Sequence, residues 1–281
     1  MSHPAIGRGN IAVITGGAGG IGLAVAHRLA GHGMRLCLVD RDADHLAKAA
    51  SDFADGLVQT FVVDVSDRAA VDDLARQVAE RFGPVSLLMN NAGVGGGGDA
   101  LSNPEGWTRV LGVNLLGVLH GVQAFVPAMA ERNAPALIIN TGSKQGITQP
   151  PGDTAYNVSK SAVRALTEGL AHTLRNRPDG KVSAHLLIPG FTYTGMTARR
   201  IATQPPGAWS PAQVADRLLD GLAAGDFYIL CQDNETTLEQ DQKRILWGAI
   251  DLIQNRPALS RWHPEWKEAF DRFMASPLEL D

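Results

Sequence analysis

The sequence has little that would direct the protein to a membrane, to export or to a metal. No run of about 18 consecutive apolar residues occurs, so no membrane-spanning segment is predicted. The N-terminus MSHPAIGRGN lacks the apolar core of a signal peptide. The only two cysteines, Cys37 and Cys231, lie in apolar stretches that favour buried, reduced thiols over a disulfide or a zinc site. We therefore expect a cytoplasmic protein without a metal site.

An excess of charge of either sign is also lacking. The 25 Lys and Arg residues stand against 29 Asp and Glu residues, which gives a net charge of −4. Proteins that bind nucleic acids usually carry a basic patch, so we expect no nucleic-acid partner. What the sequence does have is apolar side chains: 44% of its 281 residues are hydrophobic, enough to bury a large core.

Short apolar runs alternate with longer amphipathic stretches along most of the chain. The runs predict strands at 11–15, 35–40, 57–63, 85–90, 136–140, 182–188 and 227–231. The amphipathic stretches predict helices near 21–29, 43–53, 68–82, 104–132, 154–175 and 210–224. Strands that are apolar throughout are typical of a parallel sheet covered on both faces by helices. Six successive strand–helix units without a Pro- or Ser-rich linker predict an α/β fold, one doubly wound parallel sheet in a single domain.

A glycine-rich turn joins the first predicted strand to the first predicted helix. It reads Thr-Gly-Gly-Ala-Gly-Gly-Ile-Gly over residues 15–22. Glycines allow a tight turn with positive φ, and they let backbone N–H groups and the positive helix end approach a pyrophosphate. A glycine cluster alone is a weak signal. Between a strand and a helix, with an acid about 20 residues on, it predicts a Rossmann-type dinucleotide site. The candidate residues are Gly16, Gly17, Gly20, Ile21 and Gly22.

The acid is Asp40, at the end of the second predicted strand. A carboxylate there accepts hydrogen bonds from the adenine ribose hydroxyls and repels a 2′-phosphate, which favours NAD over NADP. Arg41 is the competing cation that could turn toward such a phosphate. The alternative interpretation of Asp40 is an N-cap of the following helix.

The chain resembles the short-chain dehydrogenase/reductase family from about residue 10 to 230. The family's glycine motif fits the turn, and its NNAG motif stands as residues 90–93, which implies that Asn91, Ala92 and Gly93 lie against the adenosine. An acid–hydrophobic pair near the adenine corresponds to Asp64 and Val65. The resemblance implies a nicotinamide-dependent oxidoreductase and a homo-oligomer, a dimer or tetramer in which helices near 104–132 and 154–176 pair between subunits.

The family's PG motif is Pro189-Gly190, and the threonine four residues beyond it is Thr194. Family members usually carry Val or Ile where this chain has Thr192. The resemblance implies that the backbone N–H of this residue contacts the nicotinamide amide, so we expect the change of side chain to matter little. These four residues, together with Tyr156 and Lys160, complete the expected cofactor site, in which Lys160 would reach the nicotinamide ribose hydroxyls.

Tyr156 and Lys160 form the family's YxxxK motif, and Ser143 lies thirteen residues before the tyrosine. Residues four apart share a helix face. A cation about 4 Å from the phenol would favour the phenolate by roughly 4 kcal/mol, about three pKa units, at an effective dielectric constant of about 20. The pair is then a general base for an alcohol proton, and Ser143 holds the substrate oxygen. The resemblance implies that Asn114 holds a water linking Lys160 to solvent.

Each of these residues has an ordinary interpretation on its own. Most Tyr-x-x-x-Lys strings are surface helix pairs, Ser143 suits a turn, and a buried Asn114 would bond backbone. Together, after a dinucleotide turn, they favour an enzyme that interconverts a secondary alcohol and a ketone with NAD. The alternatives are an NADPH-dependent carbonyl reductase and a non-catalytic dinucleotide-binding sensor.

The pattern loosens after Pro189. Residues 191–209 are expected to form a substrate lid within a catalytic domain of residues 1–233, and residues 234–281 a helical extension of that domain. Lys144, Arg199 and Arg200 are interpreted as solvated surface charges, with the alternative that they meet an anionic group of the substrate. Candidate substrate contacts, in the lid and beside the serine, are Lys144, Gln145, Phe191, Met196 and Trp209.

Overall fold

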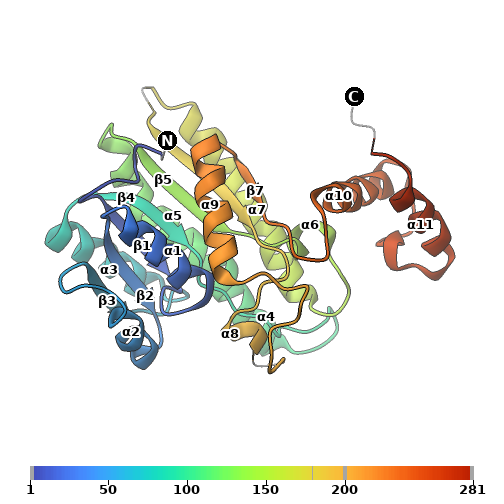
Figure 1. Ribbon diagram of the computed structural model, residues 1–281, viewed down its shortest axis with the longest axis horizontal. Helices are drawn as coiled ribbons and strands as arrows, with labels where there is room; N and C mark the ends of the chain where they lie inside the picture. Colours follow the sequence, from blue (N-terminus) through green and yellow to red (C-terminus); the bar gives the residue numbers. More distant parts are fainter. Residues whose placement is uncertain (1–2, 179, 199–200, 279–281) are drawn as a thin grey trace.

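The computed structural model describes residues 3–178, 180–198 and 201–278, so Arg199 and Arg200 lie outside the described residues. Seven parallel strands form one sheet in the order β3-β2-β1-β4-β5-β6-β7 (Figure 1). The strands are β1 Ile11–Thr15, β2 Arg35–Asp40, β3 Val58–Val62, β4 Val85–Asn90, β5 Ala136–Thr141, β6 Val182–Ile188 and β7 Tyr228–Leu230. The predicted parallel, doubly wound α/β fold is confirmed, with strand ends within two residues of the expected positions.

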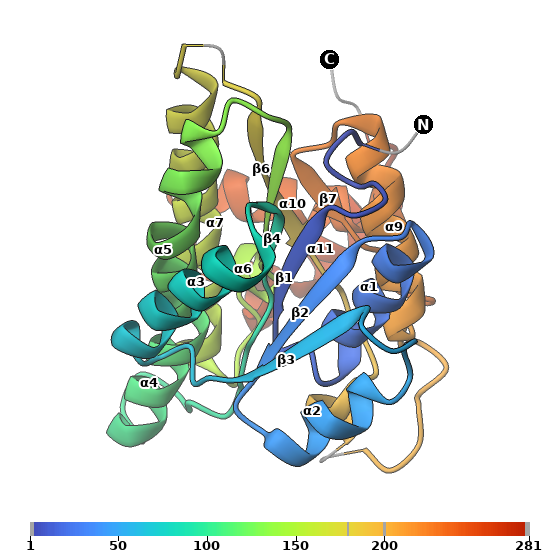
Figure 2. The ribbon, with the colours of Figure 1, turned by 90° about the vertical axis from the view of Figure 1, so that its left-hand side faces the viewer.

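Helices cover both faces of the sheet (Figure 2). Core side chains of α1 (Gly20–Gly31), α2 (Ala43–Ala50) and α9 (Pro211–Ala224) pack on one face, and those of α3 (Arg68–Phe82), α5 (Gly117–Glu131) and α7 (Thr154–Arg175) pack on the other. Along β1, Ala12 and Ile14 join the first core while Ile11 and Val13 join the second. Successive strand side chains point to opposite faces, so wholly apolar strands supply both cores.

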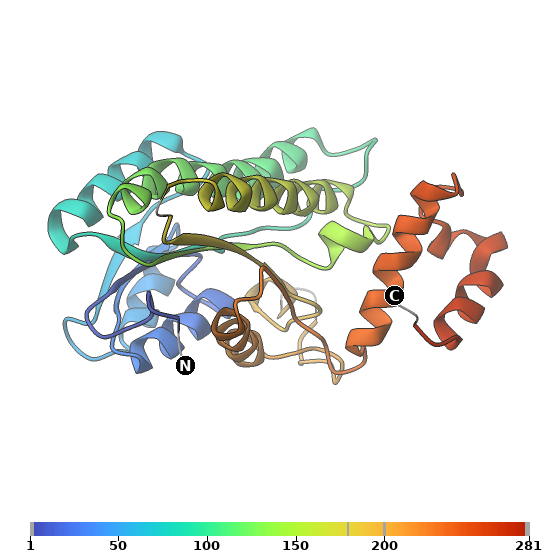
Figure 3. The same ribbon diagram turned by 90° about the horizontal axis from the view of Figure 1, so that it is seen from above.

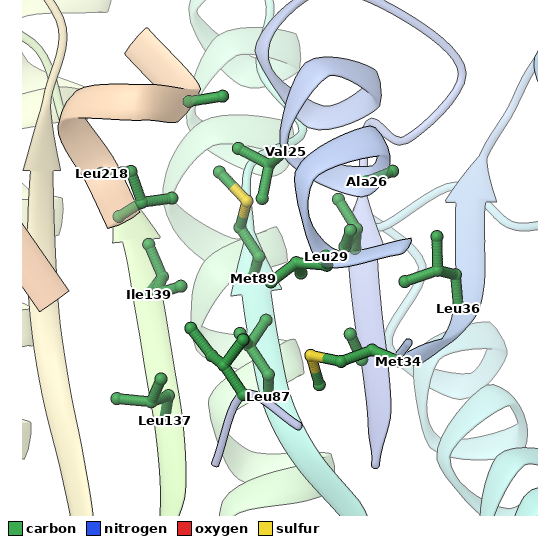
Figure 4. Packing of buried hydrophobic residues seen from close by; sticks show 14 of the residues in the cluster. Val25, Ala26, Leu29, Met34, Leu36, Leu87, Met89, Leu137, Ile139 and Leu218 are labelled. Atoms are coloured by element: carbon green, nitrogen blue, oxygen red, sulfur yellow. The ribbon is translucent and has the colours of Figure 1, made fainter. Parts of the chain in front are cut away.

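Figure 4 shows the first core from close by. Leu29 of α1, Met89 of β4 and Leu218 of α9 meet between the sheet and the helices, and all three side chains are fully buried. Cys231 belongs to the same core and Cys37 to the other. Both are free thiols, and burial raises the pKa of each to about 12, which confirms the expectation of buried thiols.

The helix predicted over 104–132 is interrupted. It consists of α4 (Pro104–Leu111), a π-helical stretch η1 (Gly112–Leu116) and α5. A π-turn is rare and is found most often at functional sites, and this one contains Asn114. By length and composition the stretch Pro104–Glu131 would also suffice to cross a membrane, which the search for unbroken apolar runs missed. Half of its most apolar 18-residue stretch is buried. Val122, Phe125 and Val126 pack on the sheet, as in the core helix of a globular protein.

Beyond β7 the chain is helical, as expected. The elements are α10 (Leu238–Ile253), the 3₁₀ turns η2 (Ser260–Trp262) and η3 (Pro264–Trp266), and α11 (Lys267–Ala275). Two short helices complete the fold, α6 (Gln145–Thr148) and α8 (Gly195–Ala198). Figure 3 shows α10 and α11 set to one side of the sheet and its covering helices. We call residues 238–275 the C-terminal arm.

Candidate active site

The strand order places a switch point between β1 and β4, because the chain winds outward in opposite directions from these two neighbours. In open α/β sheets, ligands bind outside the carboxyl ends of the strands at such a point. The glycine turn follows β1 there, and the segment Asn91–Gly93 follows β4. Two motifs far apart in the sequence therefore lie side by side.

The glycine turn is crowded by backbone. Gly16 has a φ of +64°, and a Cβ on it would lie 2.9 Å from the Cα of Ala92. A Cβ on Gly22 would collide with the carbonyl oxygen of Gly16. A Cβ on Gly19 would instead meet nothing within 4 Å. The turn is therefore closed toward the sheet and open toward the N-terminus of α1, where unpaired N–H groups favour an anion.

Asn91 joins this turn to the neighbouring strands. Its side-chain amide donates to the carbonyl oxygen of Thr15 at 3.1 Å, and its oxygen accepts from the Thr141 hydroxyl at 3.3 Å. The backbone N–H groups of Asn91 and Ala92 donate to the Thr15 hydroxyl at 2.9 and 3.1 Å. In this structure the side chain of Asn91 thus supports the turn, while Ala92 and Gly93 line the adjoining pocket.

That pocket adjoins the carboxyl ends of β2 and β3. Its lining comprises Gly16, Val39, Asp40, Arg41, Val63, Asp64, Val65, Ala92, Gly93, Val94 and Val113. The sequence analysis named seven of these residues and missed four valines, Val39, Val63, Val94 and Val113. These valines belong to no motif; they lie at or near strand ends or in the π-helical stretch. The Asp40 carboxylate accepts from the backbone N–H groups of Ala18 at 3.4 Å and Asp42 at 3.3 Å. Asp42, rather than Asp40, caps α2.

A serine, a tyrosine and a lysine meet beyond the end of β5. Lys160 is 3% exposed, and its ammonium donates to the carbonyl oxygen of Thr141 at 2.7 Å and lies 5.8 Å from the centroid of the Tyr156 ring. Ser143, two residues after β5, hydrogen-bonds the phenol through its hydroxyl. Helix α7 carries the tyrosine and the lysine on one face, as their spacing predicted.

The pKa values of the pair differ from the simple expectation. Burial raises the pKa of Tyr156, the Ser143 hydroxyl lowers it, and the negative charge of Asp153 raises it. Lys160 is not among the described groups that shift the tyrosine, and its ammonium lies beside the ring rather than 4 Å from the hydroxyl. The expectation that the lysine lowers the pKa of Tyr156 is therefore wrong for this structure. Burial instead lowers the pKa of Lys160 to about 8.

Asn114 is fully buried in the π-turn. Its side chain accepts from the N–H of Val94 at 2.8 Å and donates to the carbonyl oxygen of Val94 at 2.9 Å and to the Ser159 hydroxyl at 3.1 Å. Ser159 in turn donates to the carbonyl oxygen of Tyr156 at 2.7 Å. Asn114 thus couples the segment after β4 to the helix that carries the tyrosine.

Asp153 is a site residue that sequence reasoning missed. Its carboxylate caps α7 by accepting from the N–H of Tyr156 at 3.2 Å, and it also accepts from the N–H groups of Gly96 at 2.7 Å and Gly97 at 3.2 Å. One acid therefore holds the glycine run at 95–98 against the start of the catalytic helix. An aspartate three residues before the YxxxK tyrosine is the sequence signal that an N-cap search would have found.

The segment after β6 returns to the glycine turn. Thr194 approaches within contact distance of Gly20, since a Cβ on that glycine would lie 3.4 Å from the threonine Cβ. Thr192 is buried, and its backbone pairs with Trp209. Thr197, which the sequence did not single out, donates to the carbonyl oxygen of Thr192 at 2.8 Å and accepts from the N–H of Thr194 at 2.7 Å.

The candidate substrate residues divide into three groups. Phe191, Met196 and Gln145 are exposed. The sulfur of Met196 lies beside Gly95 of the glycine run, and the N–H of Gln145 donates to the Ser143 hydroxyl at 3.2 Å. Trp209 is partly buried and packs against the core between α1 and α9. The ammonium of Lys144 is bound by two carboxylates, at 3.2 Å by Asp233 and at 2.5 Å by Asp241. The expectation that Lys144 is a solvated surface charge is therefore wrong, because its side chain is largely buried. The two carboxylates also occupy the ammonium that the alternative interpretation assigned to an anionic substrate group.

The profile of the short chain dehydrogenase family matches residues 10–205 of this chain. The galactitol 2-dehydrogenase (L-tagatose-forming) of Cereibacter sphaeroides is 37% identical over 194 residues, 68% of this chain and 74% of that enzyme. The NADP-dependent (R)-specific alcohol dehydrogenase of Lentilactobacillus kefiri is 35% identical over 189 residues, 66% of this chain and 75% of that enzyme.

A solved structure extends the similarity to the arm. The short-chain dehydrogenase/reductase from Burkholderia phymatum, crystallised in complex with NAD, superposes with a TM-score of 0.81 at 35% identity. The superposition covers 98% of this chain and 99% of that one. Fold, sequence and site motifs agree: the chain belongs to the short-chain dehydrogenase family of oxidoreductases.

Proposed function

We propose that this protein is an NAD-preferring oxidoreductase that interconverts a secondary alcohol and a ketone, with Tyr156, Lys160, Ser143 and Asn114 as its proton-transfer site. One observation carries the proposal. The tyrosine ring, the buried lysine ammonium and the serine hydroxyl meet at the carboxyl end of β5, one strand away from the switch point.

The glycine cradle fits a nicotinamide dinucleotide. It is closed by backbone where a side chain would intrude and open at the N-terminus of α1, where a pyrophosphate would meet N–H groups. The pocket beside it offers the Asp40 carboxylate for ribose hydroxyls, with Asp64, Val65 and Ala92 around it. On the other side, the segment of Pro189, Gly190, Thr192 and Thr194 would hold the nicotinamide end. When bound, the cofactor accepts or supplies the hydride.

The protein's own residues would then manage the proton. The Tyr156 oxygen accepts the alcohol proton during oxidation and returns it during reduction. Ser143 hydrogen-bonds the substrate oxygen and keeps it beside the phenol. Lys160, held by the carbonyl oxygen of Thr141, supplies positive charge at the ribose side, and its pKa of about 8 suits proton exchange near neutrality. Asn114 keeps the segments around this pair in register, and a water held by Asn114 would link Lys160 to solvent.

The test is Tyr156→Phe against the wild type on a panel of secondary alcohols and ketones. Removing the phenolic oxygen should lower kcat by about 10²–10⁴-fold, the usual contribution of a general acid–base group. The binding of NADH, followed by fluorescence titration, should stay within about twofold. A wild type that binds NADH but turns over no member of the panel would favour the non-catalytic sensor.

The preference for NAD rests on Asp40. Its carboxylate lines the pocket and would lie near a 2′-phosphate, which it repels, whereas Arg41 on the same pocket is the residue that could offset this repulsion. Both cofactors occur among the similar proteins, NAD in the B. phymatum structure and NADP in the L. kefiri enzyme. Replacing Asp40 by Ser should weaken NADH binding by about tenfold or more. Tighter binding of NADPH than NADH by the wild type would favour the carbonyl reductase instead.

The substrate is proposed to be a small molecule that reaches Ser143 past Phe191, Met196 and Gln145. The exposed aromatic and thioether side chains favour an alcohol with apolar surface near the carbinol carbon. Each of these three side chains should change KM more than NADH affinity when it is replaced by Ala.

We also propose that the protein is a homo-oligomer and that it is cytoplasmic. Leu116 and Val158 are exposed apolar residues on η1 and α7, beside helices expected to pair between subunits. Light scattering at micromolar concentration should give a dimer or tetramer, and a monomer would contradict the proposal.

A further inference from the structure

Lys144 lies between the catalytic serine and the lid. The N–H of Lys144 donates to the carbonyl oxygen of Pro189 at 3.0 Å, and the N–H of Gly142 donates to that of Leu187 at 2.7 Å. The peptide that carries Ser143 is therefore fixed to the end of β6 on both sides. The Lys144 side chain also runs under Gly190, where a Cβ would lie 2.9 Å from its Cε and Nζ.

The ammonium of Lys144 ends in a buried ion-pair cluster. The side chains of Lys144, Asp233 and Asp241 are 14%, 12% and 5% exposed. Arg244 brings a second positive charge to 3.7 Å from Asp241 and donates to the Thr236 hydroxyl at 3.2 Å. Lys144 and the two aspartates have little contact with water, whereas Arg244 is 25% exposed, so removing Lys144 or Asp241 would leave a buried charge without its nearest partner.

This cluster connects different parts of the molecule. Asp233 follows β7, whereas Asp241 and Arg244 belong to the first turns of α10, which also contacts α6 directly after the serine. The neighbouring Asn234 donates to the carbonyl oxygens of Pro206 and Ala208 at 2.8 and 3.3 Å, at the end of the lid. In Figures 1 and 3 the arm lies beyond α6, on the side of the molecule away from β3.

We propose that Lys144 is a positioning residue: its ion pair with Asp241 of the C-terminal arm, supported by Asp233 in the segment before the arm, holds Ser143 in the orientation that the substrate oxygen requires. Lys144 touches neither substrate nor cofactor in this scheme. It acts through the serine, so the inference rests on the proposed function of Ser143. It gives the arm, which lies outside the family profile, a defined part in the reaction.

The test compares Lys144→Met and Asp241→Asn with a matched control, Lys243→Met. Lys243 is also a buried lysine, on the same helix as Asp241, but its ammonium meets Glu239 at 2.7 Å and the carbonyl oxygen of Met274 at 3.0 Å, inside the arm. Lys144→Met and Asp241→Asn should lower kcat by about tenfold, a fraction of what loss of an oxyanion donor costs, with NADH affinity unchanged. Lys243→Met should keep kcat within about twofold.

A double-mutant cycle separates positioning from general damage. In a Ser143→Ala background, Lys144→Met should lower kcat no further, because the hydroxyl that it positions is already gone. A full additional tenfold loss in that background would overturn the proposal. Asp241→Asn supplies the same cycle if Lys144→Met does not fold.

A readout without catalysis distinguishes this proposal from the proposed function. Hydrogen exchange of the amides at 142–148 should become faster in Lys144→Met and Asp241→Asn but not in Lys243→Met. Unchanged exchange would overturn the inference even if the enzyme is active. The wild type could also turn over no alcohol or ketone while the two variants still exchange faster. That result would contradict the proposed oxidoreductase function and the catalytic role of Lys144, but it would support the mechanical link between the arm and Ser143.

Discussion

The cofactor side and the substrate side of the active site are held in place by different interactions. The cofactor side is made of backbone: Gly16 and Gly22 have no room for a Cβ, and Asn91 and Thr15 hydrogen-bond main-chain groups. The substrate side is held by charged side chains that meet across long stretches of sequence, as where Lys144 reaches Asp233, 89 residues away. The first side depends on steric fit and the second on charge balance.

The difference determines how each side should fail. Close-packed backbone cannot move aside, so a single added methyl group displaces strand and helix together. A buried ion pair tolerates changes of shape but loses its compensation when one charge is removed. Steric changes should therefore act mainly on stability and cofactor binding, whereas loss of a buried charge should lower kcat as well as stability.

The largest expected effect tests the steric side. In Gly22→Ala the new Cβ would collide with the Gly16 carbonyl, which should lower stability by about 3 kcal/mol. The melting temperature should then fall by roughly 6–12 °C. Gly31→Ala, in the same helix and with nothing within 4 Å of its Cβ, is the control and should be neutral or slightly stabilising. Equal melting temperatures for the two variants, by circular dichroism without cofactor, would break the comparison.

The next effect concerns the proton-transfer pair, Tyr156 and Lys160. Below about pH 8 Lys160 is protonated, and Tyr156 is protonated as well because burial raises its pKa. The pair accepts a substrate proton only after it has released one of its own, so kcat/KM for alcohol oxidation should fall about tenfold for each pH unit below about 8. Initial rates between pH 6 and 9 measure this slope, and a flat profile would show that the pair does not limit the reaction.

A smaller effect is expected where backbone and charge combine. Asp153 both caps α7 and holds the amides of Gly96 and Gly97. Asp153→Ala should lower stability by about 1–2 kcal/mol, the usual value of an N-cap, and should raise the KM for substrate because the glycine run is released. Asp153→Asn keeps the cap and is the control. Urea unfolding and steady-state kinetics check both effects. If Asp153→Asn lost as much stability as Asp153→Ala, the effect would come from the charge and not from the cap.

The smallest effect provides the contrast for the buried cluster. Lys267 and Asp271 form an ion pair on the arm at 2.6 Å, but their side chains are 74% and 58% exposed. Lys267→Ala should change stability by less than about 0.5 kcal/mol and leave kcat unchanged, because water screens exposed pairs. A loss of kcat like that expected of Asp241→Asn would mean that any disturbance of the arm reaches the site, and that Lys144 has no special place.

Much of the fold and the cofactor side could be predicted because their signals are local. The seven apolar runs became the seven strands, and the glycine turn lies between β1 and α1 as its sequence required. The π-turn at Asn114 could not be predicted from the helical pattern, because inserting one residue into a turn hardly changes the periodicity. The pocket valines were missed since apolar residues at strand ends have the same pattern inside and outside a site.

The sequence by itself determined the parallel sheet, the helices on both faces and the order of the motifs along the cofactor side. Steric constraints on glycine and the periodicity of apolar residues act between near neighbours, so they are written in short stretches of sequence. Only the tertiary structure decided that Lys144 faces the arm rather than the substrate, and that Asp153 joins the start of α7 to the glycine run. It also decided that burial raises the pKa of Tyr156 and lowers that of Lys160. Charge pairs and desolvation depend on which residues meet in space and on how much water is excluded, and neither leaves a pattern along the chain.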